Sequence, residues 1–150
     1  MRLVTQRVLK STLRINDAVY SQIGKGLLIL VGIEETDSEE DVDWLAAKMG
    51  AMRIFSDADG KMNLDVTQIN GEIMVVSQFT LFASTKKGYR PSFIRSAKPE
   101  MAIPLYESFI KKIGELTQLP VKTGKFGADM QIELVNDGPV TIIIDSKNRE

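Results

Sequence analysis

The residues whose types first suggest chemistry are Ser77, Gln78, Phe79 and Thr80, within the sequence SQFTL. They come at the end of Glu72 to Phe79, an apolar, β-branched run that predicts a buried strand. A strand that ends in two hydroxyls and an amide around one aromatic ring brings polar groups to a sheet edge, where ligands often bind. In a simpler interpretation, which stays open on these residues alone, Ser77 and Thr80 only satisfy neighbouring backbone groups.

The absence of histidine and cysteine from all 150 residues restricts what such a site can do. A serine or threonine nucleophile lacks its usual base, and a zinc site of the Cys/His type is excluded. Lys86 or Lys87 would replace that base only in a neutral form, which burial favours and a Lys-Lys-Gly loop does not. Catalysis would therefore use carboxylates, Lys, Tyr, hydroxyls, backbone amides or a group carried by the substrate.

A second unusual stretch is Asn136-Asp137-Gly138-Pro139, which interrupts a long apolar run. Proline has no N–H to donate to a strand ladder, and the glycine before it permits backbone geometry that other residues resist. On these residues alone the stretch predicts a turn between two strands, Asp129 to Asn136 and Val140 to Asp145.

Charge is unevenly distributed, although 19 Lys and Arg residues nearly balance 20 Asp and Glu residues. The stretch Thr85 to Lys98 contains cations and no acid, with tyrosine, phenylalanine, glycine and proline between them. Spaced cations and aromatic rings suit phosphate contacts and base stacking, whereas many charge blocks are only solvated faces. The candidate contacts to nucleic-acid phosphates are Lys86, Lys87, Arg90 and Arg95.

The elements that must position these residues predict one α+β domain over residues 1–150. We expect a mostly antiparallel sheet, or a partly closed barrel, with two main helices packed on it. Alternating or continuous apolar patterns predict the strands. The expected strands and hairpins are Arg2 to Lys10, a hairpin over Thr12 to Ile23 that turns at Asn16-Asp17, Gly26 to Ile33, and a hairpin from Arg53 to Val66 that turns at 57–60.

Two helices are expected between these strands. The acidic stretch Glu34 to Asp43 opens the first, because carboxylates are favoured at a helix N-terminus and Thr36 or Ser38 can cap it. Pro99 starts the second, in which Pro104 is expected to introduce a kink. Apolar residues at helical spacing form the predicted buried stripes: Val42, Leu45, Ala46 and Met49 in the first helix, and Met101, Leu105, Phe109 and Ile113 in the second.

Other signals are weaker. Gly24-Lys25-Gly26 lacks the spacing of a nucleotide-binding loop, and Asp57 to Gly60 lacks the residue pattern of a calcium loop, so both predict turns. No metal or cofactor motif is present. No apolar run approaches the roughly 20 residues of a membrane span, and the first ten residues do not resemble a signal peptide. We therefore expect a soluble, cytoplasmic protein.

Four motifs occur in order along the chain: SQFTL at 77–81, KKGYRPSF at 86–93, TGKFGADM at 123–130 and VNDGPVT at 135–141. Together they resemble the D-aminoacyl-tRNA deacylases, also called D-tyrosyl-tRNA deacylases, over essentially the whole chain. The resemblance implies hydrolysis of the ester between a D-amino acid and the terminal adenosine of tRNA, and of glycine mischarged onto tRNA for alanine. It also implies a homodimer with active sites at the subunit interface, tRNA as partner and no cofactor.

The same resemblance implies roles for individual residues. The SQFTL motif lines the catalytic pocket. The Gly138–Pro139 bond is cis and enters the partner subunit's site, where its carbonyl oxygens bind the amino group and exclude an L side chain. The implied roles are catalytic for Ser77, Gln78, Phe79 and Thr80, chiral selection for Gly138 and Pro139 with Arg7 holding them, and adenosine binding for Phe126 and Met130.

This assignment agrees with the chemistry left by the missing histidine. An aminoacyl ester is activated, and the ribose 2′-OH beside it can position or activate water. Backbone N–H groups around Phe79 and Thr80 would stabilise the oxyanion, an effect worth about 3–4 kcal/mol for a well-aligned donor. Three alternatives stay open: Thr80 as a covalent nucleophile, a tRNA-binding module without catalysis, and a purely structural dimer.

Overall fold

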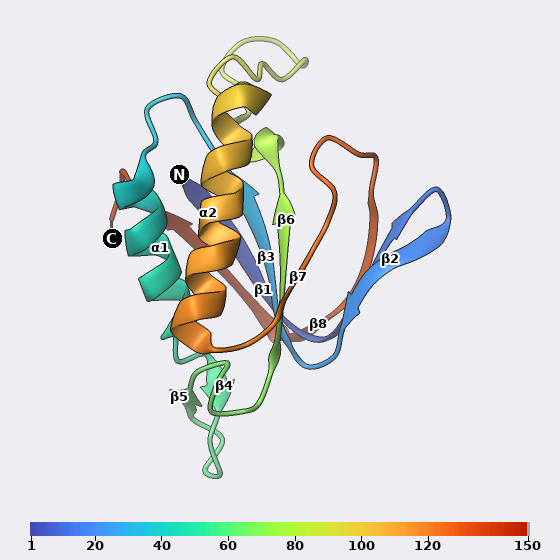
Figure 1. Ribbon diagram of the computed structural model, residues 1–150, viewed down its shortest axis with the longest axis vertical. Helices are drawn as coiled ribbons and strands as arrows, with labels where there is room; N and C mark the ends of the chain where they lie inside the picture. Colours follow the sequence, from blue (N-terminus) through green and yellow to red (C-terminus); the bar gives the residue numbers. More distant parts are fainter. Residues whose placement is uncertain (150) are drawn as a thin grey trace.

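A six-stranded sheet contains most of the strands, and β1 (Arg2–Ile15) lies at its centre. The computed structural model describes residues 1–149. β1 pairs antiparallel with β2 (Ala18–Ile23), β3 (Gly26–Gly32) and β8 (Gln131–Asp145). β3 pairs in parallel with β6 (Glu72–Ser77), which pairs in parallel with β7 (Val121–Thr123). β8 lies along one edge of β1, and β3 and β2 lie along the other. The sheet as a whole curls into a nearly closed barrel (Figure 1).

Two helices, α1 (Glu39–Gly50) and α2 (Pro99–Thr117), cover one face of this sheet (Figure 1). Ser38 is the N-cap of α1, and its N–H donates to Asp41 Oδ2 over 2.9 Å. α2 begins at Pro99 as expected, and it remains one helix through Pro104. The α+β class, the two helices and the mainly antiparallel sheet are therefore confirmed, as is the short hairpin of β4 (Phe55–Ser56) and β5 (Met62–Leu64).

Strands β3 and β6 are buried on both faces, which explains their continuous apolar runs. Residues of β3 alternate between two clusters: Leu27 and Ile29 pack under the helices, and Leu28 packs on the opposite face with Val8 and Met74. Parallel strands covered on both sides have this composition. Within residues 1–149 no helix is long and apolar enough to cross a membrane.

The end of the chain differs from the expectation. Residues 131–145 form one strand, not two strands joined by a turn. β8 pairs with β1 through Asn136 opposite Val8 and Thr141 opposite Gln6, so the segment 137–140 bulges out opposite Arg7. A bulge accommodates proline because its extra residues need no ladder hydrogen bond. Strand pairing on both sides of the bulge therefore overrides the local turn signal.

Two further boundaries were predicted wrongly. β1 does not end at Lys10 but continues to Ile15, where it enters the expected hairpin at Asn16-Asp17. β6 ends at Ser77, and the next residues form a short 3-10 helix, η1 (Phe79–Phe82). The short strand β7 was not predicted at all, because three residues after a helix are too few to show a periodic pattern.

Candidate active site

The SQFTL segment forms a tight turn that packs against β3. Leu81 N–H donates to Gln78 O over 3.2 Å, which closes the turn. Gly32 permits this packing, because a Cβ at that position would lie 2.8 Å from Leu81 Cβ and 3.1 Å from Gln78 O. A side chain at position 32 would therefore push the turn away from the sheet.

The turn leaves two backbone donors without a partner. Among the described residues, the N–H groups of Phe79 and Thr80 donate no hydrogen bond to the protein. Gln78 Nε2 donates to Thr80 Oγ1 over 2.5 Å, so the two polar side chains of the turn are tied to each other. Unused N–H groups at a fixed turn are suited to bind developing negative charge on an oxygen.

A cavity of about 290 Å³ lies beside the turn and brings two of the four motifs together. Ser77, Gln78 and Phe79 form one wall, and Phe126 and Met130 come from the segment between β7 and β8. Most of the other lining is apolar, and such a cavity with few polar groups at one edge is typical of small-molecule sites. Five of the residues predicted for catalysis or adenosine binding therefore line one cavity.

Thr80 is placed differently from its three neighbours in the motif. Thr80 lines a second hollow, of about 690 Å³, together with Arg2, Leu81 and Ile143. The turn thus stands between the two hollows, with Ser77 to Phe79 on the first and Thr80 on the second. Ile143 on β8 is largely exposed in this hollow, which leaves an apolar strand surface beside the turn.

Three residues that sequence reasoning did not single out hold this turn and the strand before it. Arg2 Nη1 donates to Leu81 O over 2.7 Å, and its guanidinium lies 4.8 Å from the centre of the Phe82 ring. Ser96 Oγ donates to Phe79 O over 2.8 Å. Tyr106 Oη donates to Val75 O in β6 over 2.8 Å, and burial raises the pKa of this phenol, so it stays a donor. No local sequence signal reveals these contacts.

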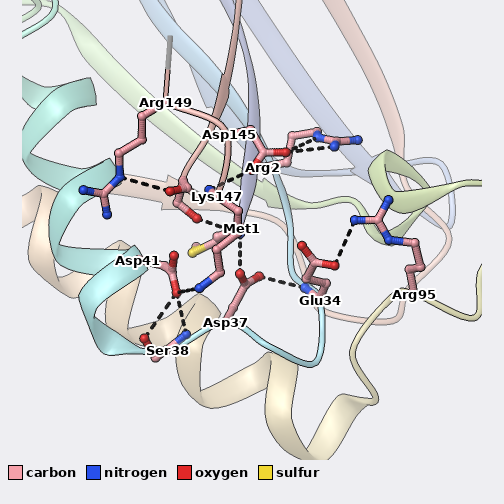
Figure 2. A network of polar contacts seen from close by, with 11 residues as sticks. Met1, Arg2, Glu34, Asp37, Ser38, Asp41, Arg95, Asp145, Lys147 and Arg149 are labelled. Carbon is pink, nitrogen blue, oxygen red and sulfur yellow. Dashed lines mark hydrogen bonds and ion pairs between the residues drawn. The ribbon is translucent and has the colours of Figure 1, made fainter.

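Arg2 belongs to a network of ion pairs at the end of the sheet (Figure 2). Its Nη2 and Nε lie 2.8 and 3.0 Å from Asp145 Oδ2. Burial disfavours the charged form of Asp145, but hydrogen bonds from Arg2 and from the backbone of Lys147 lower its pKa overall. Lys147 Nζ in turn contacts Asp41 Oδ2 at 2.8 Å, so the segment after β8 is tied to the start of α1.

A second guanidinium, that of Arg95, also contacts the Phe82 ring at the end of the turn. Arg95 lies 5.3 Å from the centre of the Phe82 ring, and its Nη2 lies 3.0 Å from Glu34 Oε2. Phe82 is almost fully buried, so its ring is held by two cations that are each paired with a carboxylate. The four candidate phosphate contacts therefore fall into two groups. Arg95 is ion-paired with Glu34, whereas Lys86, Lys87 and Arg90 form no ion pair with the described residues.

The Gly138–Pro139 segment lies in the bulge of β8, away from the cavity. The peptide bond is cis, as the resemblance implied. Gly138 has φ +119°, and a Cβ there would lie 2.8 Å from Val140 Cγ2 and 3.0 Å from Arg7 Nη2. Arg7 Nη1 donates to Ile54 O over 2.6 Å, and Arg7 Nε lies 3.0 Å from Asp137 Oδ2. The buried Arg7 therefore links the bulge to the segment before β4.

The turn lies at the start of β1 and the bulge lies near the middle of the strand. The turn contacts Arg2 and the bulge contacts Arg7, and the five-residue step between them spans about 16 Å and places their side chains on opposite faces of the strand. Within one chain the segment 138–139 does not line the cavity. Among residues 1–149 there is also no group of three or more acidic residues that could hold a metal ion.

Comparison with known proteins places the chain in a family. A family model described as D-Tyr-tRNA(Tyr) deacylase matches residues 4–145. The chain belongs to this family. The class of enzyme expected from the four motifs, an ester hydrolase acting on aminoacyl-tRNA, is thereby confirmed at the level of the family.

Relatives in this family match over the full length. A protein from Akkermansia muciniphila named D-aminoacyl-tRNA deacylase is 63% identical over 150 residues, which is 100% of both chains. A protein of the same name from Parabacteroides distasonis is 59% identical over the same coverage.

Two solved structures resemble the chain as well. One named c-Myc DNA Unwinding Element Binding Protein has a TM-score of 0.90 and 36% identity, covering 97% of this chain and 98% of its own. A probable eukaryotic D-amino acid tRNA deacylase has a TM-score of 0.81 over 95% and 97% of the two chains. At 17% identity that likeness shows the fold alone.

Proposed function

We propose that this chain hydrolyses the ester bond of D-aminoacyl-tRNA, and of glycyl-tRNA mischarged on tRNA for alanine, as a cytoplasmic homodimer. The observation that carries the proposal is the meeting of Ser77 to Phe79 with Phe126 and Met130 around one cavity, beside two unused backbone N–H groups. The names of the full-length relatives support the same substrate class.

In this proposal the terminal adenosine enters the cavity and the ester lies over the turn. The aromatic ring of Phe126 and the thioether of Met130 offer apolar contact to a purine. The carbonyl oxygen of the ester then points at the N–H groups of Phe79 and Thr80. Fixed donors aimed at the oxyanion stabilise the tetrahedral intermediate more than the substrate.

The reaction needs no side-chain base. Water adds to the ester carbonyl carbon, the bond to the ribose oxygen breaks, and that oxygen leaves with a proton while the amino acid departs as a carboxylic acid. The neighbouring ribose hydroxyl positions the water and helps to move its proton. Thr80 Oγ1 accepts a hydrogen bond from Gln78, which is not a base, so a non-covalent role for Thr80 is favoured over nucleophilic attack.

Chiral selection is assigned to Gly138 and Pro139 of a second copy. Within one chain Gly138 and Pro139 do not line the cavity beside the turn, so one chain does not bring the turn and the bulge to the same substrate. In a two-fold symmetric dimer each active site can combine the turn of one copy with the bulge of the other copy. Main-chain carbonyl oxygens in the bulge would bind the amino group and leave no space for an L side chain, which is specificity by exclusion.

Mixing two defective variants tests this arrangement. Phe126→Ala damages the cavity, and Gly138→Ala places a Cβ against Val140 and Arg7. In a mixed dimer with crossed sites, one site carries both defects and the other is intact, so random mixing restores about a quarter of wild-type D-aminoacyl-tRNA hydrolysis. Mixtures that stay inactive, with mixed dimers verified, contradict the crossed site. Wild-type protein that hydrolyses neither the D nor the L ester contradicts the function itself.

Thr80→Ala separates the two chemical mechanisms. Hydrolysis of D-aminoacyl-tRNA by this variant within about tenfold of wild type is expected if water attacks directly, because a lost side-chain contact costs about 1 kcal/mol. Complete loss of turnover, together with a trapped acyl-enzyme in the wild type, would instead establish Thr80 as the nucleophile.

A further inference from the structure

The basic loop has a narrow neck and an open tip. Ser84 and Ser92 exchange two backbone hydrogen bonds, with Ser84 N–H to Ser92 O at 2.8 Å and Ser92 N–H to Ser84 O at 2.9 Å. The segment 85–91 is thereby held as a projecting loop, which lies beyond the N-terminal end of α2 (Figure 1). Its base is fixed further by the contact of Arg95 with Glu34 and of Ser96 with Phe79.

The tip of this loop carries an aromatic ring without any packing partner. Tyr89 is fully exposed, and among the described residues it forms no hydrogen bond or ring contact. Three cations, Lys86, Lys87 and Arg90, surround it in sequence and are equally free of ion pairs there. A large exposed ring among unpaired cations has no role in holding the fold together.

Aromatic rings continue from the cavity wall toward this loop. Phe79, which lines the cavity, is half exposed, and Phe93 packs on it edge to face with ring centres 5.1 Å apart. Phe93 follows directly after the neck residue Ser92. Exposed rings therefore lead outward from the proposed adenosine cavity through Phe79 and Phe93 to a loop tipped by Tyr89.

We propose that the loop between Ser84 and Ser92 binds the unpaired nucleotides that precede the terminal adenosine, with a base stacked on Tyr89 and phosphates held by Lys86, Lys87 and Arg90. This inference rests on the proposed function, because it takes an RNA end as the ligand. Rings flanked by cations are the usual device for binding single-stranded nucleic acid. A duplex offers no free base face for an exposed ring, so Tyr89 selects unpaired nucleotides over the acceptor helix.

The loop then has two kinds of cation. Arg95 is an anchor that holds the loop base to Glu34 and to the turn. Lys86, Lys87 and Arg90 contribute the salt-dependent attraction to phosphates. Removing a tip cation should weaken RNA binding and reduce its dependence on salt, whereas removing the Tyr89 ring should weaken binding and leave that dependence unchanged.

Binding of two labelled RNAs tests the proposal without requiring catalysis: the trinucleotide CCA and a blunt duplex of acceptor-stem length. Relative to the wild-type protein, we expect Tyr89→Ala to raise the Kd for CCA about tenfold and to leave the Kd for the duplex unchanged. Tyr89→Phe should bind both RNAs as the wild type does. Lys86→Ala should reduce the slope of log Kd against log salt, whereas Lys61→Ala, an exposed lysine of the β4–β5 hairpin at the far end of the molecule in Figure 1, should not.

Other outcomes overturn the inference. Equal loss of CCA and duplex binding in Tyr89→Ala, or no loss in either, removes the stacking role. Recovery of binding by Tyr89→Leu as fully as by Tyr89→Phe replaces stacking with simple apolar contact. Hydrolysis of a D-tyrosyl ester of adenosine, measured on the same proteins, reports on the proposed function separately, because that substrate has no nucleotide to reach the loop.

Discussion

Arg2→Met removes the guanidinium that joins the end of β8 to the site turn. Arg2 donates to Leu81 O in the turn, pairs with Asp145 and stacks on Phe82. Methionine keeps much of the apolar stem, so contact with the Phe82 ring survives in part. The substitution therefore removes mainly polar interactions, and these allow the expected effect to be worked out.

Two contributions set the size of that effect. The charge-assisted hydrogen bond to Leu81 O is worth about 1.5–3 kcal/mol. The ion pair with Asp145 is partly solvated, with 30% of the Arg2 and 16% of the Asp145 side chain exposed, and pairs of this kind add about 1 kcal/mol. We expect Arg2→Met to lower the free energy of unfolding by about 2.5–4 kcal/mol at pH 7.

The pH dependence of this loss follows from Asp145. Burial disfavours the charged carboxylate, but the hydrogen bond from Arg2 helps to lower its pKa below the usual value. A lowered pKa contributes stability above the unfolded value of about 3.9 and loses it as pH falls through the folded value. The difference between wild type and Arg2→Met should therefore shrink below about pH 4 and leave only the contribution of the Leu81 bond.

Urea unfolding at pH 7 and pH 3 measures both quantities, and D-aminoacyl-tRNA hydrolysis by the folded variant reports on the turn. The matched control is Arg14→Met, because the Arg14–Glu133 pair on the same strand is exposed and should cost at most about 0.5 kcal/mol. An equal loss in both variants, or a loss in Arg2→Met that is the same at both pH values, would refute the assignment of Arg2.

Two substitutions at glycines follow from close approaches. Gly26→Ala would place its Cβ 1.9 Å from Glu72 O, which separates β3 from β6, and we expect loss of the folded state by circular dichroism. Gly124→Ala would place its Cβ 2.5 Å from Met130 Sδ. The flexible thioether can move, so stability should change by less than about 1.5 kcal/mol, while the altered cavity raises KM for D-aminoacyl-tRNA. Gly114→Ala in α2 is the control and should leave KM unchanged.

The sheet and the helices could be predicted because their signals are local. Continuous apolar runs at 26–33 and 72–77 require burial on both faces, and the stripe of Val42, Leu45 and Met49 has a helical period. The bulge at 137–140 has an equally local signal, that of a turn, and the prediction was wrong. Only the pairing of β8 with β1 before and after the bulge decides the outcome, and the register between strands 130 residues apart is absent from local patterns.

Only part of the site could be predicted, because its remaining contacts also join segments that are distant in the sequence. Motif residues Ser77, Gln78, Phe79, Phe126 and Met130 meet at one cavity, but only the resemblance, not their spacing, grouped them. The positioning contacts were missed because each joins distant segments: Arg2 and Leu81 are 79 residues apart, and Tyr106 and Val75 are 31 apart. An arginine in a predicted strand has many possible partners, and the sequence does not rank them.

This chain has no histidine, and its proposed catalytic donors are backbone N–H groups. Catalysis should therefore depend on the residues that position the backbone more than on any one catalytic side chain. A side-chain catalyst is lost by one substitution, whereas the N–H groups of Phe79 and Thr80 survive every substitution except proline. Their effect depends on where the turn lies, which Gly32, Arg2 and Ser96 determine from outside the cavity. Changes at these positions should therefore lower kcat with little change in KM, because the oxyanion forms only in the transition state, whereas changes at cavity residues should act mainly on KM.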